Sequence, residues 1–567
     1  MEKQKKFYSD VVIIGAGLSG IDMACQLQRQ LHVSDYVIYD RARELGGAWA
    51  ANKYPGCSVD IPGALYSLSW FPNPDFTSLF PSQKEILSYI QRVACVNHVN
   101  EHVRVQTEWK GAQWVEASGT WHVYLCDLNT EEEFLHEAKV LISAVGGYTN
   151  PKLPALPGLE KFEGPVVHTA KWSKEYDLRG LNVAVVGNGC SGSQVVPAVI
   201  DEVNSLTQFI RSPQHYVPMP IGNYRFGKAL RACFSYIPLT LLLIRWLIFW
   251  ILDTTLAQFY DSYKGKGIRE ERASYSRKYI TENAPERYWP LLTPGYDLGC
   301  RRRILDNHYI RSLRNPRMKL IKDSIAQVDS KSVTTGSGDK YPVDFIVLAT
   351  GFEFTQWKAN EVIGRQGKSL KQHWDHRGGI GAYKTVAMNE FPNMFYLLGP
   401  NAGSGHTSVL FAMECSVNLV IARPILQRQA SIVEVCKGAE TEWCDTIQTA
   451  LSKTVLARNC SNIDVRDLAE MHIAALTNPA AANKRFVIGH PLSFDEIAEY
   501  LRKLPELEER IGENSGIIPP VPRFDIEEAV EVFGDLARGR SKEQTFIDTA
   551  KQLLKLERAI PKAENTV

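Results

Sequence analysis

Two glycine-rich loops have the spacing that binds the phosphates of a nucleotide. The first loop lies in DVVIIGAGLSG (10–20) and the second in LNVAVVGNGCSG (181–192); each follows an apolar run that favours a buried strand and precedes a helical pattern. The repeated G-x-G-x-x-G glycines are Gly15, Gly17 and Gly20, then Gly187, Gly189 and Gly192. The first glycine of each set permits a tight turn, the second lets the backbone approach a pyrophosphate, and the third allows close helix packing. We therefore expect two dinucleotides, each with its phosphates at a helix N-terminus.

Further residues of each motif indicate which nucleotide is bound. Ser19 and Ser191 lie inside the two loops and are predicted to contact the cofactors. Asp40 ends the next strand, twenty residues beyond Gly20, where a carboxylate binds a ribose hydroxyl. Arg211 has the corresponding place after the second loop, and an arginine there suits the 2′-phosphate of NADPH. The alternative for Arg211 is a solvated loop residue.

A third motif ends on a carboxylate that has no basic residue close to it in the sequence. Residues 46–60, GGAWAANKYPGCSVD, end on Asp60, and this stretch matches the motif GGxWxxxxYPGxxxD of Baeyer–Villiger monooxygenases. Between the two loops, FEGPVVHTAKW resembles the fingerprint FxGxxxHxxxW of the same family, although Ser173 follows where Pro or Asp is common. The fingerprint positions are Phe162, Gly164, His168 and Trp172. GCRRRILD (299–306), ATGF (349–352) and FPNMFYLLGPN (391–401) extend the resemblance over roughly residues 8–460.

The resemblance implies a reaction that inserts oxygen beside a ketone. In such enzymes NADPH reduces FAD, and O2 adds to the reduced flavin to give a C4a-peroxide, which converts the ketone to an ester or lactone. The resemblance assigns Arg302 to hold the negative charge of the peroxide and Asp60 to position Arg302; a guanidinium suits this because it stays charged and offers a planar fork of donors. We expect a bulky ketone as substrate and a place for the enzyme in secondary metabolism.

The alignment with the family motifs also implies further contacts. The FAD site is expected to include Gly47, Ala48, Trp49, Asp60 and Tyr66, and the NADPH site Arg211, Ser212, Arg301 and Arg302. His168 is expected either to couple cofactor binding to domain movement or to be structural.

These sites require particular elements around them. The pattern predicts an α/β fold with two Rossmann-like dinucleotide-binding domains, one for FAD and one for NADPH, a helical insertion and an atypical α/β C-terminal tail. We expect the FAD domain at 1–150 and 336–460, the NADPH domain at 151–335 with the insertion at about 225–290, and a C-terminal segment at 461–567. That last segment resembles the tail of extended short-chain reductases, including a strand at 485–488, but no reductase nucleotide half precedes it.

Composition limits the classes of protein and partner. The 567 residues include 64 basic and 63 acidic side chains, and this balance argues against a nucleic-acid partner. The eleven cysteines form no CxxC pair, which argues against a disulfide framework and a metal site and favours a reducing, cytoplasmic compartment. The N-terminus, MEKQKKFYSD, lacks the apolar run of a secretory signal.

The sequence leaves alternatives open for the position of one apolar segment and for the reaction. IPLTLLLIRWLIFWIL (237–252) is expected to be a helix buried against another domain or chain, a contact with a membrane surface, or a membrane span. Instead of a ketone oxidation, the peroxide could attack nitrogen or sulfur, and the replaced C-terminus favours a third alternative, an inactive flavoprotein acting as a binding module. Product identity and substrate-stimulated NADPH oxidation distinguish these functions.

Overall fold

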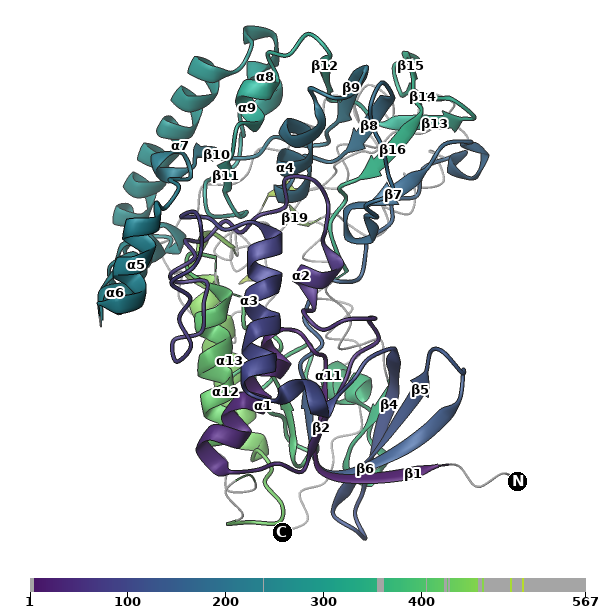
Figure 1. The fold of residues 1–567 in the computed structure, drawn as a ribbon, viewed down its shortest axis with the longest axis vertical. Coiled ribbons are helices and arrows are strands. Elements are labelled where there is room, and N and C mark those ends of the chain that lie inside the picture. Colours follow the sequence, from purple (N-terminus) through teal and green to yellow (C-terminus); the bar gives the residue numbers. More distant parts are fainter. Residues whose placement is uncertain are drawn as a thin grey trace.

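The chain folds into two α/β units stacked along the long axis of the molecule (Figure 1). The computed structural model describes residues 5–456, apart from 238, 354–360, 404, 423–425 and 427–428, together with 461–462, 490–491 and 502–503. The predicted reductase-like tail and its strand at 485–488 lie almost wholly outside the described residues. Apart from residues 502–503, only the short strands β19 (Ser461–Asn462) and β20 (His490–Pro491) are described there.

The first unit is built on a mixed eight-stranded sheet. Its order is β17-β4-β5-β6-β1-β2-β3, and β18 also pairs with β6. The strands are β1 (Lys6–Ile14), β2 (Tyr36–Tyr39), β3 (Val103–Arg104), β4 (Thr107–Val115), β5 (Thr120–Asp127), β6 (Glu133–Ser143), β17 (Glu361–Ile363) and β18 (Met394–Tyr396). The central strands β1, β2, β6 and β18 are parallel, whereas β5 is antiparallel to both β4 and β6.

Alternation along β1 explains why both faces of this sheet are covered. Val11 and Ile13 face a core shared with α1 (Leu18–Leu31), α3 (Gln83–Val96) and α12 (Val409–Ile421). Val12 and Ile14 face the other core, with apolar residues from β4 and β5 and from α11 (Leu370–His376). Successive side chains of a strand point to opposite faces, so a continuous apolar run is required here.

The second unit has a fully parallel sheet with the order β12-β9-β8-β16-β7. The strands are β7 (Val166–His168), β8 (Asn182–Val186), β9 (Ser205–Phe209), β12 (Met318–Ile321) and β16 (Phe345–Leu348). The helix α4 (Cys190–Val199) connects β8 to β9 in a right-handed unit typical of nucleotide-binding folds. A separate antiparallel sheet is formed by β13 (Ile325–Asp329), β14 (Ser332–Thr335) and β15 (Lys340–Pro342). The expectation of two Rossmann-like domains is confirmed.

The position of β16 differs from the sequence prediction. We expected residues 336–460 to belong to the first unit, but β16 is hydrogen-bonded to β7 and β8 in the second sheet. A buried parallel strand followed by glycine occurs in both units, and this pattern does not specify which sheet the strand joins. The remaining domain limits stay predictions.

Two neighbouring segments connect the units. The backbone N–H of Lys152 donates to Gly351 O at 2.9 Å, and that of Glu353 donates to Asn150 O at 3.0 Å. The outgoing chain at 150–152 and the returning chain at 350–353 therefore run side by side, so the return to the first unit follows residue 350.

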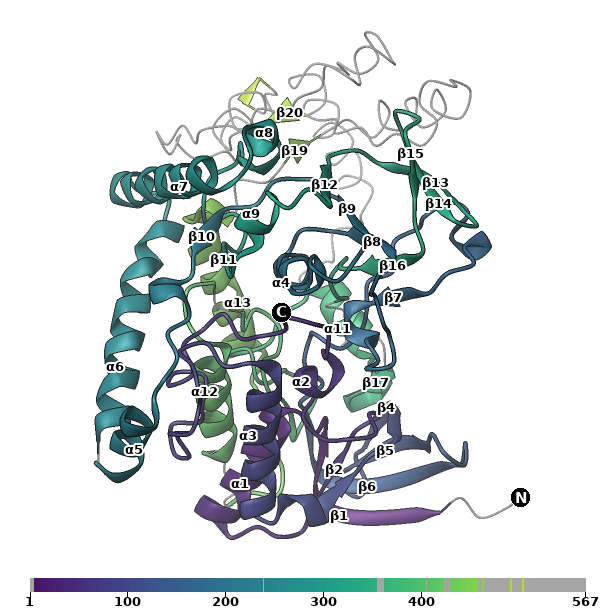
Figure 2. The same cartoon turned by 45° about the horizontal axis from the view of Figure 1, so that its top comes forward.

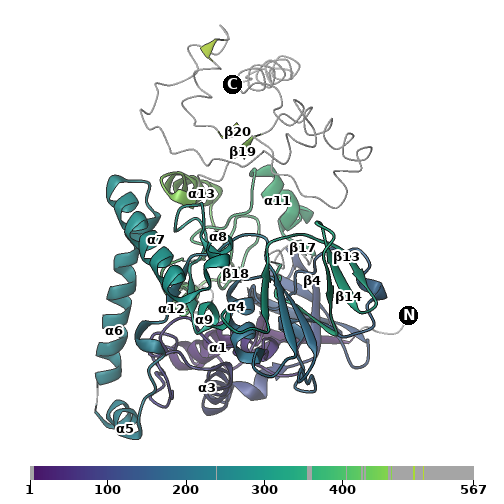
Figure 3. The ribbon, with the colours of Figure 1, turned by 90° about the horizontal axis from the view of Figure 1, so that it is seen from above.

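A helical insertion projects from one side of the second unit (Figures 2 and 3). It contains α5 (Lys228–Tyr236), α6 (Thr240–Asp253), α7 (Tyr263–Asn283) and α8 (Trp289–Leu292), close to the predicted range of about 225–290. After it, β11 (Ile304–Asp306) pairs in parallel with β10 (Tyr216–Pro218). Within the described residues, the other α-helices are α2 (Ala48–Ala51), α9 (Tyr309–Ser312) and α13 (Lys437–Ser452).

Candidate functional site

The first glycine loop has the geometry of a phosphate cradle. Gly15 has φ +111° and donates its N–H to Tyr39 O, which ties the turn to the end of β2. A Cβ on Gly20 would stand 2.0 Å from Gly15 O, so only glycine lets α1 begin this close to the strand. The first N–H groups of α1 have no partner within the helix and can therefore receive an anion.

Asp40 supports this loop directly. Its carboxylate oxygens accept hydrogen bonds from the N–H groups of Ala16 (2.7 Å) and Ala42 (2.8 Å). A carboxylate can accept further bonds, so binding of a ribose hydroxyl by Asp40 stays a prediction compatible with these contacts.

The GGxW segment lies against the first loop. Gly46 donates its N–H to Ala16 O, and a Cβ on Gly47 would stand 2.7 Å from Gly17 Cα. The indole of Trp49 on α2 donates to the hydroxyl of Tyr66 at 3.0 Å, and the two rings meet edge to face. The GGxW segment and the first glycine loop, both predicted to bind FAD, are therefore in contact.

The second loop repeats the geometry of the first. Gly187 again has φ +111°, and a Cβ on Gly192 would stand 2.4 Å from Gly187 O. At Gly189 an added Cβ would meet no atom within 4 Å among the described residues, which leaves room for a pyrophosphate beside the start of α4.

The basic residues predicted for NADPH gather after β9. Arg301 donates from Nη1 to the hydroxyl of Ser212 at 2.8 Å and lies over the ring of Tyr296. Arg211, the residue before Ser212, is exposed. The structure thus places Arg211 beside the contact between Ser212 and Arg301; their roles at NADPH stay predictions.

Asp60 and Arg302 meet although 242 positions separate them. Nη2 of Arg302 lies 2.8 Å from Oδ1 and 2.7 Å from Oδ2 of Asp60, and the carboxylate raises the pKa of the arginine further. Asp60 comes from the first unit, whereas Arg302 precedes β11 in the second. The side chain of Arg302 is 46% exposed, so it remains accessible to a bound molecule.

Arg303 is a further basic residue near Asp60, and the comparison with the family motifs did not predict it. Burial, together with the neighbouring charges of Arg272 and Arg302, lowers the pKa of Arg303 to about 10. The positive charges beside Asp60 therefore outnumber the single carboxylate, which favours an anion at this place.

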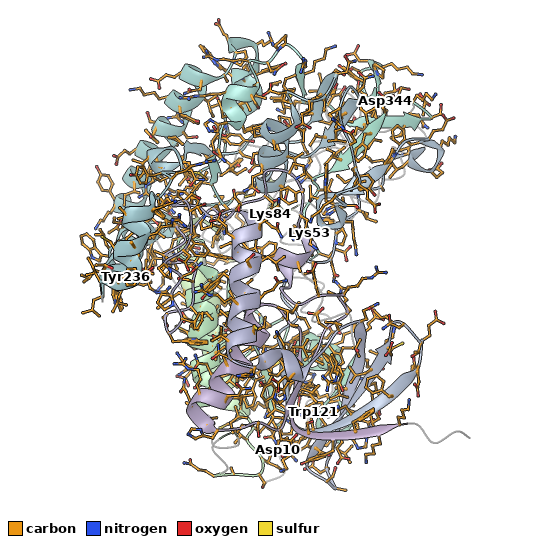
Figure 4. All side chains as sticks on the ribbon, in the orientation of Figure 1. Asp10, Lys53, Lys84, Trp121, Tyr236 and Asp344 are labelled. Carbon is orange, nitrogen blue, oxygen red and sulfur yellow. The ribbon has the colours of Figure 1, made fainter. Side chains whose placement is uncertain are left out.

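The turn that carries Asp60 is attached to the second unit. Tyr54 is buried in the core of that unit and donates its hydroxyl to Gln194 Oε1 at 2.8 Å. Nε2 of Gln194, on α4, in turn donates to Ser58 O at 3.0 Å. Gly56 has φ +79°, and a Cβ there would stand 2.3 Å from Gln194 O. Lys53, just before this turn, lies between the two units in Figure 4.

Gln194 is the residue that sequence reasoning missed. Gln194 is a single polar residue on α4, and no sequence motif indicates that its side chain bonds to Tyr54, 140 positions away. Its hydrogen bonds to Tyr54 and Ser58 fix the turn that leads to Asp60.

The fingerprint residues belong to the second unit, and His168, at the end of β7, contacts the connection between the two units. His168 is buried; its Nδ1 accepts from the N–H of Ala170, so Nε2 carries the proton and donates to Gly351 O at 3.0 Å. Burial lowers the pKa of His168, which keeps the ring neutral near pH 7. Trp172 packs in the core of the second unit, and a Cβ on Gly164 would stand 2.2 Å from Asp344 O. Phe162 packs against the core on the other face of the same sheet.

Comparisons with known proteins agree with this arrangement. Residues 8–208 match the family model of flavin-binding monooxygenase-like proteins. A Baeyer–Villiger monooxygenase of Streptomyces coelicolor is 33% identical over 452 residues, which cover 78% of this chain and 84% of that protein. An uncharacterized monooxygenase of Sinorhizobium fredii is 36% identical over 438 residues, 75% of this chain and 65% of its own length.

Solved structures extend the likeness to the fold. The open crystal structure of cyclohexanone monooxygenase superposes with a TM-score of 0.69 at 26% identity, covering 79% of this chain and 94% of that one. Cyclohexanone monooxygenase from Rhodococcus sp. Phi1 bound to NADP+ gives a TM-score of 0.68 at 26% identity, covering 81% and 92%. By its sequence relatives, its fold and its motifs, the chain belongs to the Baeyer–Villiger family of flavin-binding monooxygenases.

Proposed function

We propose that this protein oxidises a bulky ketone to an ester or lactone, with O2 as co-substrate. Membership of the family makes it an NADPH-dependent flavin monooxygenase with FAD and NADPH as cofactors. The observation that supports the ketone reaction most is the contact of Arg302 with both oxygens of Asp60 across the two units. A place in secondary metabolism stays a prediction.

The residues present fit both cofactors. The first loop, with Gly15, Gly17 and Gly20, would hold the pyrophosphate of FAD at the start of α1, and the GGxW segment would close over it. The second loop would hold NADPH at α4, with Arg211, Ser212 and Arg301 near its phosphate and ribose. When bound, FAD reduced by NADPH supplies the activation of O2.

Arg302 provides positive charge where oxygen chemistry must develop negative charge. Its guanidinium is charged throughout the physiological pH range and has donors left over after its contact with Asp60. An arginine that is already held in place does not have to reorient when negative charge develops beside it. This preorganisation of charge is the main source of electrostatic catalysis.

Asp60 restricts where that guanidinium can stand. An arginine side chain has many rotamers, and a carboxylate bonded through both oxygens selects a small number of them. The turn at 54–58, held by Gln194, in turn fixes Asp60 relative to the second unit.

The test follows both NADPH and the oxygen atoms. The purified protein with FAD is given NADPH, isotopically labelled O2 and a panel of bulky ketones, and the products are analysed by mass spectrometry. Ketone-stimulated NADPH oxidation with one labelled atom in an ester is the expected result. Labelled N-oxides or sulfoxides from matched amines and sulfides, without any ester, would favour heteroatom oxygenation. Absence of any substrate-stimulated turnover would favour an inactive flavoprotein.

A further inference from the structure

Helix α6 presents an apolar face to solvent. The face consists of Leu242, Leu243, Trp246, Leu247, Trp250 and Ile251, whose exposed fractions range from 42% to 67%. These residues recur at helical spacing, so they lie together along one side of α6. Figures 2 and 3 show α6 along one edge of the molecule. A contiguous exposed apolar surface of this kind marks an interaction site.

The opposite side of α6 is fixed to the first unit. Arg245 is buried, lies 3.0 Å from Glu414 on α12, and donates to the backbone carbonyls of Ala64 and Ser67. Ile248, Phe249 and Leu252 pack against the core of that unit. Separating a buried arginine from its carboxylate leaves an uncompensated buried charge, so α6 is firmly held on this side.

This attachment argues against one of the three alternatives for the segment, a membrane span. The helical stretch Thr240–Phe259 is long and apolar enough to cross a membrane by length and composition. Its far end is also attached, because Arg272 donates to the side chain of Gln258 and Arg269 donates to the Gln258 carbonyl. A helix held at both Arg245 and Gln258 can lie on a bilayer but cannot cross one without losing these contacts. The inner face of α6 is buried against the first unit, whereas its outward face is exposed in the single chain, so a second chain and a membrane surface remain as possible partners of that face.

The chain that leads into the apolar face is basic. No Asp or Glu occurs between residues 203 and 252, whereas Arg225, Lys228 and Arg231 lie at or just before α5. The first carboxylate after them is Asp253, at the far end of α6, which lies 3.4 Å from His406. Helix α5 packs against α6, and Tyr236 at its end is 84% exposed and lies at the outer edge of the molecule in Figure 4. Exposed tryptophan and leucine beside lysine and arginine are typical of helices that lie in a membrane interface.

We propose that α5 and α6 form a docking surface for an anionic lipid membrane, with α6 parallel to the bilayer plane. Trp246 and Trp250 enter the headgroup region, and Arg225 and Lys228 attract the lipid phosphates. A second copy of the chain is a poorer occupant, because a two-fold contact would bring the same three basic residues of each copy together, and Asp253 is the one carboxylate that α5 and α6 offer to face them.

Flotation of the full-length protein with lipid vesicles tests the proposal. We expect binding to phosphatidylcholine vesicles that contain phosphatidylglycerol, weaker binding to phosphatidylcholine alone, and a decrease with added salt. Trp246→Glu with Trp250→Glu should reduce the bound fraction roughly tenfold or more, since both side chains must then carry charge into the interface. Arg225→Glu with Lys228→Glu should remove the preference for anionic vesicles.

Matched controls keep the result interpretable. Val96 on α3 is 57% exposed and lies outside the proposed surface, so Val96→Glu should bind vesicles like the wild type. Flavin content and circular dichroism confirm that each variant is folded. Full-length wild-type protein that does not float with anionic vesicles would overturn the proposal, whether a second copy or the C-terminal residues cover the face. Equal binding by the double tryptophan variant would overturn it as well.

Discussion

At the residue scale, the pair of Asp60 and Arg302 concentrates the chemistry. Both oxygens of one carboxylate face one guanidinium nitrogen, which limits the arginine without neutralising every donor on it. The motif predicted which residues would meet, because each stands in a segment that resembles the family. It could not predict the contribution of Arg303, whose pKa depends on burial and on Arg272 from a separate helix.

The carboxylate should matter less than the arginine. Asp60→Ala leaves the positive charge present but lets it move, so we expect ketone turnover to fall about tenfold, less than in Arg302→Ala. Asp60→Asn should retain part of the placement through its remaining oxygen acceptor. Steady-state ester formation with matched flavin content measures both variants. A wild-type rate in Asp60→Ala would show that the guanidinium does not need this partner.

Arg211 should determine the preference for the nicotinamide cofactor. Arg211→Ala removes a charge that suits the 2′-phosphate, so KM for NADPH should rise about tenfold while KM for NADH changes little. The measurement is flavin reduction with each cofactor. Arg179→Ala, a change at another exposed arginine of the second unit, serves as the control. An unchanged NADPH preference in Arg211→Ala would assign the phosphate contact to another residue.

At the element scale, the turn at 54–58 links the two nucleotide units. Its tyrosine is part of the second unit's core although the chain around it belongs to the first, and α4 holds it from the side. The same helix begins at the second glycine loop. Placement of Asp60 therefore depends on the element that is expected to hold NADPH.

Removing this link should change catalysis without loss of FAD. Gln194→Met keeps the side-chain length but removes the hydrogen bonds to Tyr54 and Ser58, which contribute about 1 kcal/mol each. We expect ester formation to slow by roughly tenfold and the melting temperature to fall by a few degrees. Tyr54→Phe removes only one of the bonds and should have a smaller effect on both. Normal turnover in a destabilised Gln194→Met protein would limit the residue to a structural role.

At the scale of the whole molecule, the sequence predicted the two Rossmann-like units and the helical insertion from apolar runs and glycine spacing, but not the antiparallel strands β4 and β5 of the first sheet. It placed β16 in the wrong sheet, because local patterns specify a buried strand but not its neighbours. The sequence pattern also could not predict which face of α6 is buried. That face is set by the ion pair of Arg245 with Glu414, which lies on a helix far away in the sequence. His168 was left between two roles, and its bond to Gly351 now places it on the connection between the units.

The connection between the units should respond to pH through His168. Burial lowers the pKa of His168 below 6.5, so the neutral ring favours folding above about pH 6.5 and this contribution is lost as pH falls further. His168→Gln can still donate to Gly351 O and accept from Ala170 N–H, and should remove this loss at acidic pH. Thermal unfolding of wild type and variant at about pH 7.5 and pH 5.5 compares them. A difference in melting temperature that does not vary with pH would contradict the neutral, buried ring.

The measurement that tests the central claim most directly is incorporation of labelled O2 by Arg302→Ala. A ketone that the wild type converts is supplied with NADPH and labelled oxygen gas, and the ester is analysed by mass spectrometry after FAD content is matched. Loss of a charged donor of this kind costs about 3 to 4 kcal/mol, so the labelled ester should form two to three powers of ten more slowly. A yield and rate of labelled ester equal to those of the wild type would contradict the assignment of Arg302.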